Sequence, residues 1–401
     1  MDYSTDYTEY LNGGEELLLD VASTLITRTV ALPKTEPYRL LLAIMLCSSS
    51  LGSRTMPRLF SYGLKGSGKS ELAKLFARVR LQPMLASKTT YASIRNLIND
   101  SNYYDPKLGA IEGNLREGSF LCWDNLRPDQ LLSDSSTYQL LLSGYSRSTS
   151  NIQISSPVAG TNISFNCFSP VILSSIFPLH IDSEFDELHR RMITIPHKPF
   201  ELFSQLELDD LTAAGGLTDI YSKLDIDDCD FTGFSDRYKD YWDDDARELL
   251  AHNRKRLIVA SKGKGSPFRQ AGSAFFTLMV DVLAHGFTLQ AWSSFDQCAN
   301  WFMALHRERT NVDTQSESAS LVLLKRFVDS QTETMRQLNI QLIASGAQPL
   351  LLRVPASDVK AHLDSLSQEG RLEKRVQVRE RNQLMSQLGY RLDAKSWVQI
   401  Q

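Results

Sequence analysis

The chain has 401 residues, of which 42% are hydrophobic and 22% are charged, and its formal net charge is −4. This length predicts two or three domains with large cores, and the balanced charge excludes binding of nucleic acid by bulk electrostatics, so any basic site must be local. Five scattered cysteines and short apolar runs exclude a zinc finger, a disulfide framework and a membrane anchor, and they predict a cytoplasmic protein.

Residues 1–57 predict a helical segment that packs on the domain after it, with no catalytic constellation of its own. Residues 58–81 then contain GLKGSGKS, which matches the pattern GxxxxGK[ST] in full. A short β-prone run precedes this motif and an apolar helical face follows it. The sequence therefore predicts a strand, a glycine loop and a helix, in which backbone N–H groups converge on an anion.

Each residue type in this motif has an expected role in holding a nucleotide. Lys69 is expected to reach the β- and γ-phosphates, and the Ser70 hydroxyl is expected to ligate Mg²⁺. The glycines allow backbone angles that other residues resist. The predicted nucleotide-binding residues are Gly63, Lys65, Gly66, Ser67, Gly68, Lys69, Ser70 and Glu71.

A second strand is predicted at residues 120–123, which form a short apolar run typical of a buried parallel strand. Asp124 follows this strand and is the expected second ligand of Mg²⁺. Asn125 stands where many ATPases carry a glutamate that orients the attacking water, and an amide is not a base. Hydrolysis is therefore expected to be slow or to use a base from elsewhere.

A third strand is predicted around residues 171–173, and Ser174 follows it. Its hydroxyl either contacts the γ-phosphate or the lytic water, or belongs to an ordinary turn. A helix at 184–191 and a strand at 192–195 leave Arg190 and Arg191 at their junction. These arginines either stabilise phosphoryl-transfer charge in a neighbouring subunit or pair with Glu184 or Glu187.

The segments GLKGSGKS, FLCWDN, PVILSS and ELHRRMITI stand in an order that resembles the motors of superfamily 3 helicases, which are AAA+-type ATPases of viral, phage and plasmid primase-helicases. The resemblance covers about residues 35–200. It implies an α/β fold with a parallel-sheet P-loop core at 58–200, ATP and Mg²⁺ as cofactors, and a first sensor strand and an arginine-finger segment. The catalytic candidates are then Lys69, Asp124, Asn125, Ser174, Arg190 and Arg191.

The same resemblance implies partners. They are further copies of the chain in a ring, expected to be a hexamer, single-stranded DNA in its central pore, and a separate primase or replication protein. Residues 151–168 alternate like a β-hairpin and lie where such motors carry a DNA-contacting hairpin. The tip has no cation, so Ser156 and Thr161 would contact DNA, with Arg147 nearby. A purely structural hairpin is the alternative.

Residues 201–314 predict an acidic stretch followed by a helical region. Between residues 207 and 248 there are 14 Asp and Glu against four Lys and Arg, which indicates a solvated acidic face. A basic patch follows at 253–270 and is a candidate DNA contact or a solvated surface. Its candidate residues are Arg254, Lys255, Arg256, Lys262 and Lys264.

Residues 315–401 predict a small separate domain with three helices followed by a short β-ribbon, and the order helix, helix, short wing is that of a winged helix. Arg375 and Arg379 are its candidate DNA contacts, and a protein-interaction module is the alternative. The sequence thus favours an ATP-dependent ring-forming DNA motor in the replication of a phage or mobile element. The competing hypothesis is a slowly hydrolysing, ATP-gated switch that assembles on DNA or a protein, as transposition regulators and defence ATPases do.

Overall fold

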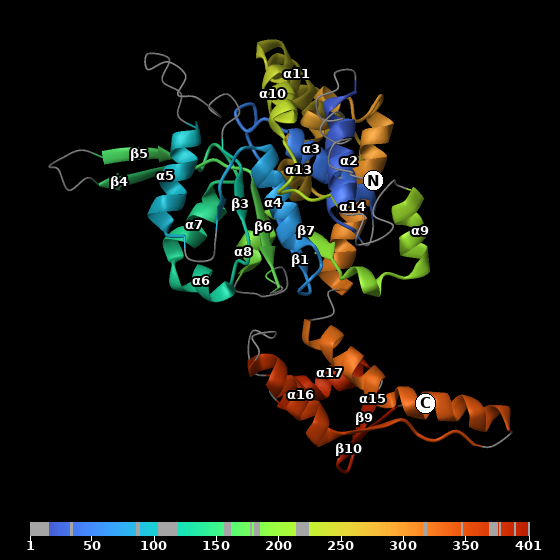
Figure 1. Cartoon of the computed structure of the whole chain (residues 1–401). Coiled ribbons are helices and arrows are strands. Elements are labelled where there is room, and N and C mark those ends of the chain that lie inside the picture. The colour runs from blue at the N-terminus through green and yellow to red at the C-terminus, as the bar shows by residue number, and fades with distance from the viewer. Residues whose placement is uncertain are drawn as a thin grey trace. The chain divides into compact units, whose positions relative to one another are not determined.

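The computed structural model describes residues 16–32, 35–85, 89–102, 119–155, 162–176, 179, 185–213, 224–315, 319–345, 348–368, 376, 378–388 and 390–399. The chain divides into two compact units, Met1–Thr314 and Gln315–Gln401 (Figure 1). Among the described residues, unit 1 contains a five-stranded and a two-stranded sheet, and unit 2 contains a three-stranded sheet.

Unit 1 is an α/β structure built around a five-stranded parallel sheet, which confirms the predicted fold class at this level. The strand order is β2-β3-β6-β1-β7, and every neighbouring pair is parallel. Because these strands all run in the same direction, all their carboxyl ends lie at one edge of the sheet. The strands are β1 (Arg58–Gly63), β2 (Met84–Leu85), β3 (Leu121–Trp123), β6 (Val171–Ser175) and β7 (Met192–His197).

Alternating apolar residues along these strands bury both faces of the sheet. Leu59 of β1 joins a core that contains α2 (Leu18–Thr29), α3 (Thr35–Cys47) and α4 (Lys69–Val79). Its neighbour Phe60 joins a second core on the opposite face. Figure 1 shows the helices of this second core on the other side of the sheet. They are α5 (Tyr91–Asn102), α6 (Pro128–Ser133), α7 (Ser135–Ser143) and α8 (Asp186–His189).

A helical layer follows the sheet in the sequence. Its central member is α13 (Ser273–Thr288), which is buried along most of its length and packs against α3 and α11. No helix among the described residues is long and apolar enough to cross a membrane. The other elements are the 3₁₀ helix η2 (Phe200–Leu202), α9 (Gln205–Ala213), α10 (Thr232–Tyr241), α11 (Asp244–Ser261), α12 (Pro267–Gln270) and α14 (Phe295–Gln315).

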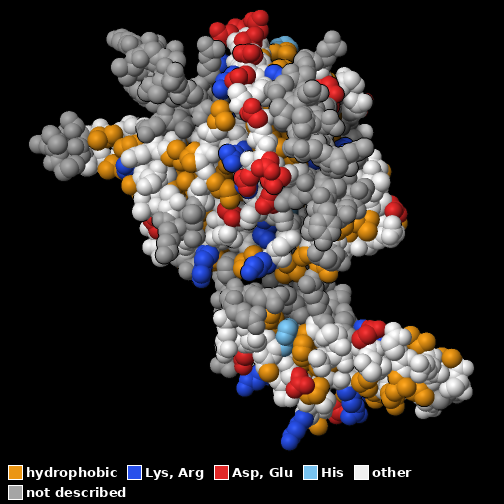
Figure 2. Space-filling view, viewed as in Figure 1, with side chains coloured by type: hydrophobic (Ala, Val, Ile, Leu, Met, Phe, Trp, Pro, Cys, Tyr) orange, Lys and Arg blue, Asp and Glu red, His pale blue; other side chains and the backbone are white. Residues whose placement is uncertain are grey.

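Part of the acidic stretch contacts the first helix after the glycine loop. Asp227 accepts hydrogen bonds from Lys74 and from Arg78, which lie one turn apart on α4. Other acidic side chains of this region lie at the surface, and Figure 2 shows them gathered over α10 and α11. The described part of the stretch is therefore largely a solvated acidic face, as predicted.

The predicted β-hairpin is confirmed by β4 (Asn151–Ser155) and β5 (Asn162–Asn166), which pair antiparallel. The ribbon projects beyond α5 in Figure 1. Two contacts attach its base to that helix. The Arg95 guanidinium lies 3.9 Å from the centre of the Phe165 ring, and the Asn166 N–H donates to the Asn99 side chain at 2.9 Å.

The described part of unit 2 combines three helices with a three-stranded antiparallel sheet in the order β8-β10-β9. Leu324, Val328 and Val354 lie in its interior. The elements are α15 (Ala319–Ala344), β8 (Arg353–Pro355), α16 (Ala356–Gln368), α17 (Val378–Gln387), β9 (Tyr390–Asp393) and β10 (Ser396–Gln399).

Candidate functional site

The glycine-rich loop joins the end of β1 to the start of α4. Gly66 and Gly68 have φ of 82° and 84°, in the left-handed region that favours glycine. Gly68 is the N-cap of α4 and Lys69 is its first residue. The unsatisfied N–H groups and positive dipole of this helix end therefore face the space above the loop, where they favour an anion.

A cavity of about 310 Å³ opens at this loop. Its size is within the range of small-molecule sites. The loop side contributes six of the eight predicted nucleotide-binding residues, Gly66 to Glu71 in sequence, whereas Gly63 and Lys65 are not among the lining residues. The opposite side contributes Thr29, Val30, Ala31, Lys198 and Phe200.

Gly63 has a structural reason to be glycine. A Cβ atom at this position would lie 2.1 Å from the carbonyl oxygen of His197, because β1 and β7 run side by side up to this point. No side chain fits at such a distance. Gly63 thus allows β1 to lie close beside β7 at the point where the glycine-rich loop begins.

Lys69 is 6% exposed, and its ammonium group is held by the loop itself. Nζ donates to the Leu64 carbonyl at 2.7 Å and to Ser67 Oγ at 3.3 Å. Burial lowers the pKa of Lys69 to about 8, and the nearby charge of Asp124 opposes that shift. A phosphate ligand would supply the negative charge that this buried ammonium lacks.

His197 also supports the loop, and sequence reasoning missed it. The ring is 5% exposed, and Nδ1 lies 3.3 Å from the Ser67 carbonyl, to which it can only donate. Burial, aided by the charge of Lys69, lowers its pKa to about 3, so the imidazole is neutral at pH 7. Its only signal in the sequence is its place two residues after the strand predicted at 192–195.

Asp124, which follows β3, accepts hydrogen bonds from serines of α4 and β6. Ser70 Oγ donates to Asp124 Oδ1 at 2.9 Å, and Ser174 Oγ donates to the same oxygen. This arrangement follows from the strand order, because β6 lies between β1 and β3. The structure therefore brings together three of the predicted site residues, Ser70, Asp124 and Ser174.

Asn125 lies beside this carboxylate in a left-handed conformation, with φ of 54°. Its N–H donates to Ser174 Oγ at 3.1 Å, and its side-chain amide donates to Asp124 Oδ2 at 3.1 Å. Asparagine tolerates this backbone region better than most residues. The amide is thus a donor that orients Asp124, and it supplies no base.

The site offers oxygen ligands suited to Mg²⁺. Ser70 Oγ and Asp124 Oδ1 lie close enough to share one cation, and Mg²⁺ keeps waters and substrate phosphates as its remaining ligands. Within the described residues, no three His, Cys, Asp or Glu side chains gather as a metal site. Ser70 and Asp124 are thus the two side chains of this cluster that could hold a cation.

Arg190 and Arg191 both pair with Glu187, at 2.9 Å each. This confirms one of the two alternatives for these arginines, whereas Glu184 lies outside the described residues. The Arg190 side chain is 71% exposed, and the Arg191 guanidinium lies 4.9 Å from the centre of the Tyr145 ring. A contact with a neighbouring subunit stays a prediction.

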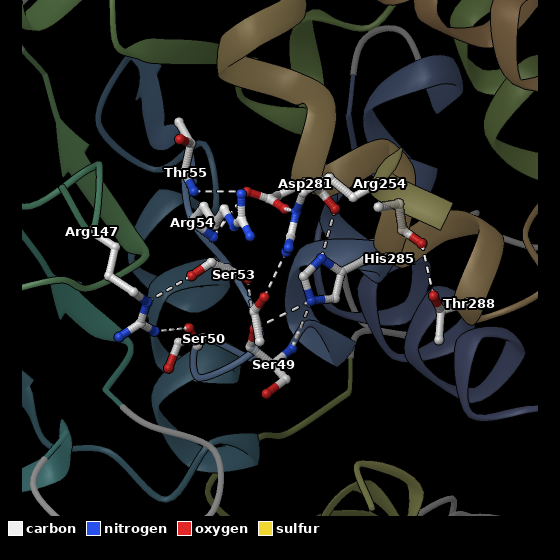
Figure 3. A network of polar contacts seen from close by, with 12 residues as sticks. Ser49, Ser50, Ser53, Arg54, Thr55, Arg147, Arg254, Asp281, His285 and Thr288 are labelled. Atoms are coloured by element: carbon white, nitrogen blue, oxygen red, sulfur yellow. Dashed lines mark hydrogen bonds and ion pairs between the residues drawn. The ribbon is translucent and has the colours of Figure 1, made fainter. Parts of the chain in front are cut away.

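Two predicted DNA contacts have internal partners instead (Figure 3). Arg254 is 6% exposed, forms an ion pair with the fully buried Asp281, and donates to the Gly52 carbonyl at 2.6 Å. Its prediction as an exposed cation is wrong, because α11 turns it toward α13. Arg147 donates to the Ser53 carbonyl at 2.8 Å and stacks over Phe168, so the structure gives it a structural role.

The remaining DNA-binding candidates divide into two groups. Lys255, Arg256, Lys262 and Lys264 are exposed at the end of α11 and the loop after it. Ser156, Thr161 and Arg375 lie outside the described residues, and Arg379 lies in α17, where its side chain is not described.

These features define an α/β protein with a cavity where the first strand of a parallel sheet meets a helix N-terminus, and with a serine–aspartate–serine cluster beside it. No protein-family model matches the chain, and no curated protein matches it significantly.

Proposed function

We propose that the chain is an AAA+-like P-loop ATPase that binds ATP together with Mg²⁺. The observation that carries this proposal is the cluster of Ser70, Asp124 and Ser174 at the strand ends beside Lys69 and the glycine loop. A loop that bound a simple anion would not need an acid next to it. An acid that can share a cation with Ser70 is what a magnesium–nucleotide complex requires.

In this proposal each side of the cavity has its own role. The N–H groups at the start of α4 and the Lys69 ammonium hold the phosphates, while Ser70 and Asp124 hold Mg²⁺, which neutralises phosphate charge. Val30, Ala31 and Phe200 line the opposite side and offer apolar surface to the base. Lys198 is paired with Glu207 at 2.6 Å, so it adds little net charge there.

The test is binding of a fluorescent ATP analogue with and without Mg²⁺. Lys69→Ala is expected to weaken binding by a factor of about 100 or more, because a charge-assisted contact in a buried site is lost. Arg78→Ala is the matched control, since Arg78 lies on the same helix and its guanidinium pairs with the exposed Asp227 at 3.3 Å. Equal binding by Lys69→Ala and wild type would refute the proposal.

We further propose that the ATPase works as a ring-forming motor on DNA, similar to superfamily 3 helicases. Arg190 is exposed and available to a neighbouring subunit once it leaves Glu187. In the projecting ribbon, β4 exposes the polar side chains of Asn151, Gln153 and Ser155, and the cations after α11 offer phosphate contacts. ATP turnover should then rise several-fold with single-stranded DNA, and forked DNA should be unwound.

The basic surface gives the sharper test of DNA binding. Lys262→Glu with Lys264→Glu should lower DNA affinity and flatten its salt dependence, because two phosphate contacts are lost. Lys239→Glu is the control, since Lys239 lies on α10 beside Asp236. If both variants bind DNA like wild type, the cations after α11 are a solvated surface and this part of the proposal fails.

One observation favours the second candidate, an ATP-gated switch with slow hydrolysis. Asn125 donates its amide to Asp124, and it stands where a base is expected. In this case ATP drives assembly, and turnover stays at the level of Lys69→Ala with or without DNA. Measuring assembly and turnover in the same samples separates the two candidates, because a motor shows DNA-stimulated turnover and a switch does not.

For unit 2 we propose a winged-helix fold. Three helices and an antiparallel sheet in which the strands β9 and β10 form a terminal ribbon support this proposal. A winged helix presents one helix and its ribbon to DNA or to a protein. Substitution of Arg391 by Glu on β9, read by DNA binding of the full chain, tests whether the ribbon contacts DNA.

A further inference from the structure

Unit 1 has a second cavity, which shares no lining residue with the cavity at the glycine loop. Its volume is about 340 Å³, within the range of small-molecule sites. Glu187, Arg190 and Arg191 line it where α8 leads into β7, and Ser273 and Thr277 line it from the first two turns of α13. We call this space the arginine cavity.

The lining of the arginine cavity carries a net positive charge. Two of its residues are arginines, and Glu187 is the one acid among them. The Glu187 carboxylate pairs with Arg190 and with Arg191 at 2.9 Å each, and its side chain is 54% exposed. Because ion pairs at such an exposed carboxylate contribute little, a stronger anion can take its place between the two guanidiniums.

Arg191 keeps a donor that its surroundings leave unsatisfied. Both arginines reach Glu187 through Nη1, whereas Arg191 Nε is buried and has no hydrogen-bond partner in the described part of the chain. The Arg191 guanidinium also lies 4.9 Å from the centre of the Tyr145 ring, and Tyr145 lines the cavity too. A guanidinium over a ring still offers the N–H groups at its edge to an oxyanion.

A third guanidinium adds positive charge from the protein interior. Arg58 is 1% exposed, and its acceptors among the described residues are the carbonyl oxygens of Leu141 and Ser169. Burial, and after it the charge of Arg191, lowers the pKa of Arg58 to about 9, so it stays charged at pH 7. Carbonyl oxygens do not neutralise this charge, and the two arginines therefore lie in one positive region.

The start of α13 contributes further donors to the same space. Gly272 is the N-cap of this helix, with φ of 91°, and no side chain caps it there. Ser273 and Thr277 are exposed and lie one turn apart, so their hydroxyls share one face of the helix. The dipole of a helix of 16 residues thus adds to the charge of the arginines.

We propose that the arginine cavity binds a phosphoryl oxyanion, which displaces Glu187 from Arg190 and Arg191. A phosphoryl group brings up to two negative charges and three acceptor oxygens, and this matches two guanidiniums, two hydroxyls and a helix N-terminus. A carboxylate offers less, since Glu187 already supplies one and leaves Arg191 Nε without a partner. The site is complete within one chain, so it needs no neighbouring subunit and does not rest on the proposed ATPase activity.

Calorimetric titration of the full chain with pyrophosphate tests the proposal, in the Lys69→Ala background so that the glycine loop contributes little. We expect saturable binding of one anion per chain. Arg190→Gln should weaken it at least about tenfold, because a charge-assisted contact is lost. Arg247→Gln is the matched control: like Arg190 it pairs with an acid three residues earlier, and it does not line the cavity.

Two further variants change the charge of the cavity in opposite directions. Glu187→Gln should tighten binding several-fold, because it removes the competing carboxylate, while Asp244→Asn should leave binding unchanged. Thr277→Glu should weaken binding at least as much as Arg190→Gln, because it places a carboxylate in the cavity. Thr277 is exposed near a helix N-terminus, where an acid is tolerated, so the fold is kept.

Titration of ATP into the same Lys69→Ala chain identifies the source of the phosphoryl group. Tighter binding of ATP than of pyrophosphate assigns the site to a nucleotide, and equal or weaker binding assigns it to a free anion. Two results would overturn the proposal: a chain that does not bind pyrophosphate, or binding that Arg190→Gln, Thr277→Glu and Glu187→Gln all leave at the level of Arg247→Gln.

Discussion

Asp281 is the residue whose substitution should destabilise unit 1 most clearly. It is fully buried in α13, where Oδ1 accepts from Arg254 and Oδ2 accepts from the backbone N–H groups of Arg54 and Thr55 at 2.9 and 2.7 Å. These contacts join the helical layer to the segment that leads into β1 (Figure 3). Asp281→Asn keeps the shape of the side chain but removes its negative charge. The new amide N–H group would then face N–H groups that are themselves donors.

The expected cost follows from these partners. Breaking one member of a buried ion pair leaves an uncompensated charge, here on Arg254, and costs about 3–5 kcal/mol. For a unit of this size, 1 kcal/mol lowers the melting temperature by about 2 °C, so the variant should melt about 6–10 °C below wild type. Replacing both partners, as in Arg254→Met with Asp281→Leu, should recover part of this loss, because no unpaired charge then remains.

The assay is thermal unfolding of the full chain, followed by tryptophan fluorescence. Trp242 reports on this region, since its ring lies 5.1 Å from that of His285 on the same helix as Asp281. Asp244→Asn is the control: this acid is 98% exposed and pairs only at the surface with Arg247. The reasoning fails if Asp281→Asn melts no lower than this control.

Three further predictions concern single residues. Burial lowers the pKa of His285 to about 4, below the 6.5 of this group in an unfolded chain. The free energy of unfolding should therefore be level above pH 6.5 and fall by about 1.4 kcal/mol per pH unit toward pH 4. Urea unfolding at several pH values should show a flatter slope for His285→Gln and an unchanged slope for His252→Gln. A thiol reagent should label Cys229 first, because the other four cysteines are buried; fast labelling that persists in Cys229→Ser would contradict this. Gly63→Ala should lower the melting temperature by forcing β1 from β7, and an unchanged melting curve would contradict the close approach to His197.

The sequence predicted those parts of the site whose signals are local. The motif at residues 63–70 specifies strand, loop and helix within a few turns of chain, and these elements lie where they were expected. The meeting of Asp124 with Ser70 was also predictable, because parallel strands end at one edge. Ser174 joined them for the same reason, although its sequence equally suited a turn.

Other roles depend on partners that the sequence does not bring close. Arg254 was taken for a surface cation because it stands among Lys255 and Arg256. Its spacing from the buried Leu250 and Leu257 places it on the inner face of α11, but only Asp281, 27 residues later, makes that burial possible. His197 could not be assigned at all, since its contact with the loop depends on how β7 ends beside β1.

The order of elements around β6 has a consequence for the ribbon. The hairpin strand β5 ends at Asn166, four residues lead to Val171, and Ser174 lies toward the far end of the same strand. β6 is a strand of five residues, about 16 Å long, and it is hydrogen-bonded on one side to β1 and on the other to β3. One short buried strand and four further residues therefore join Ser174 to the base of the ribbon, which Arg95 and Asn99 of α5 contact from the side.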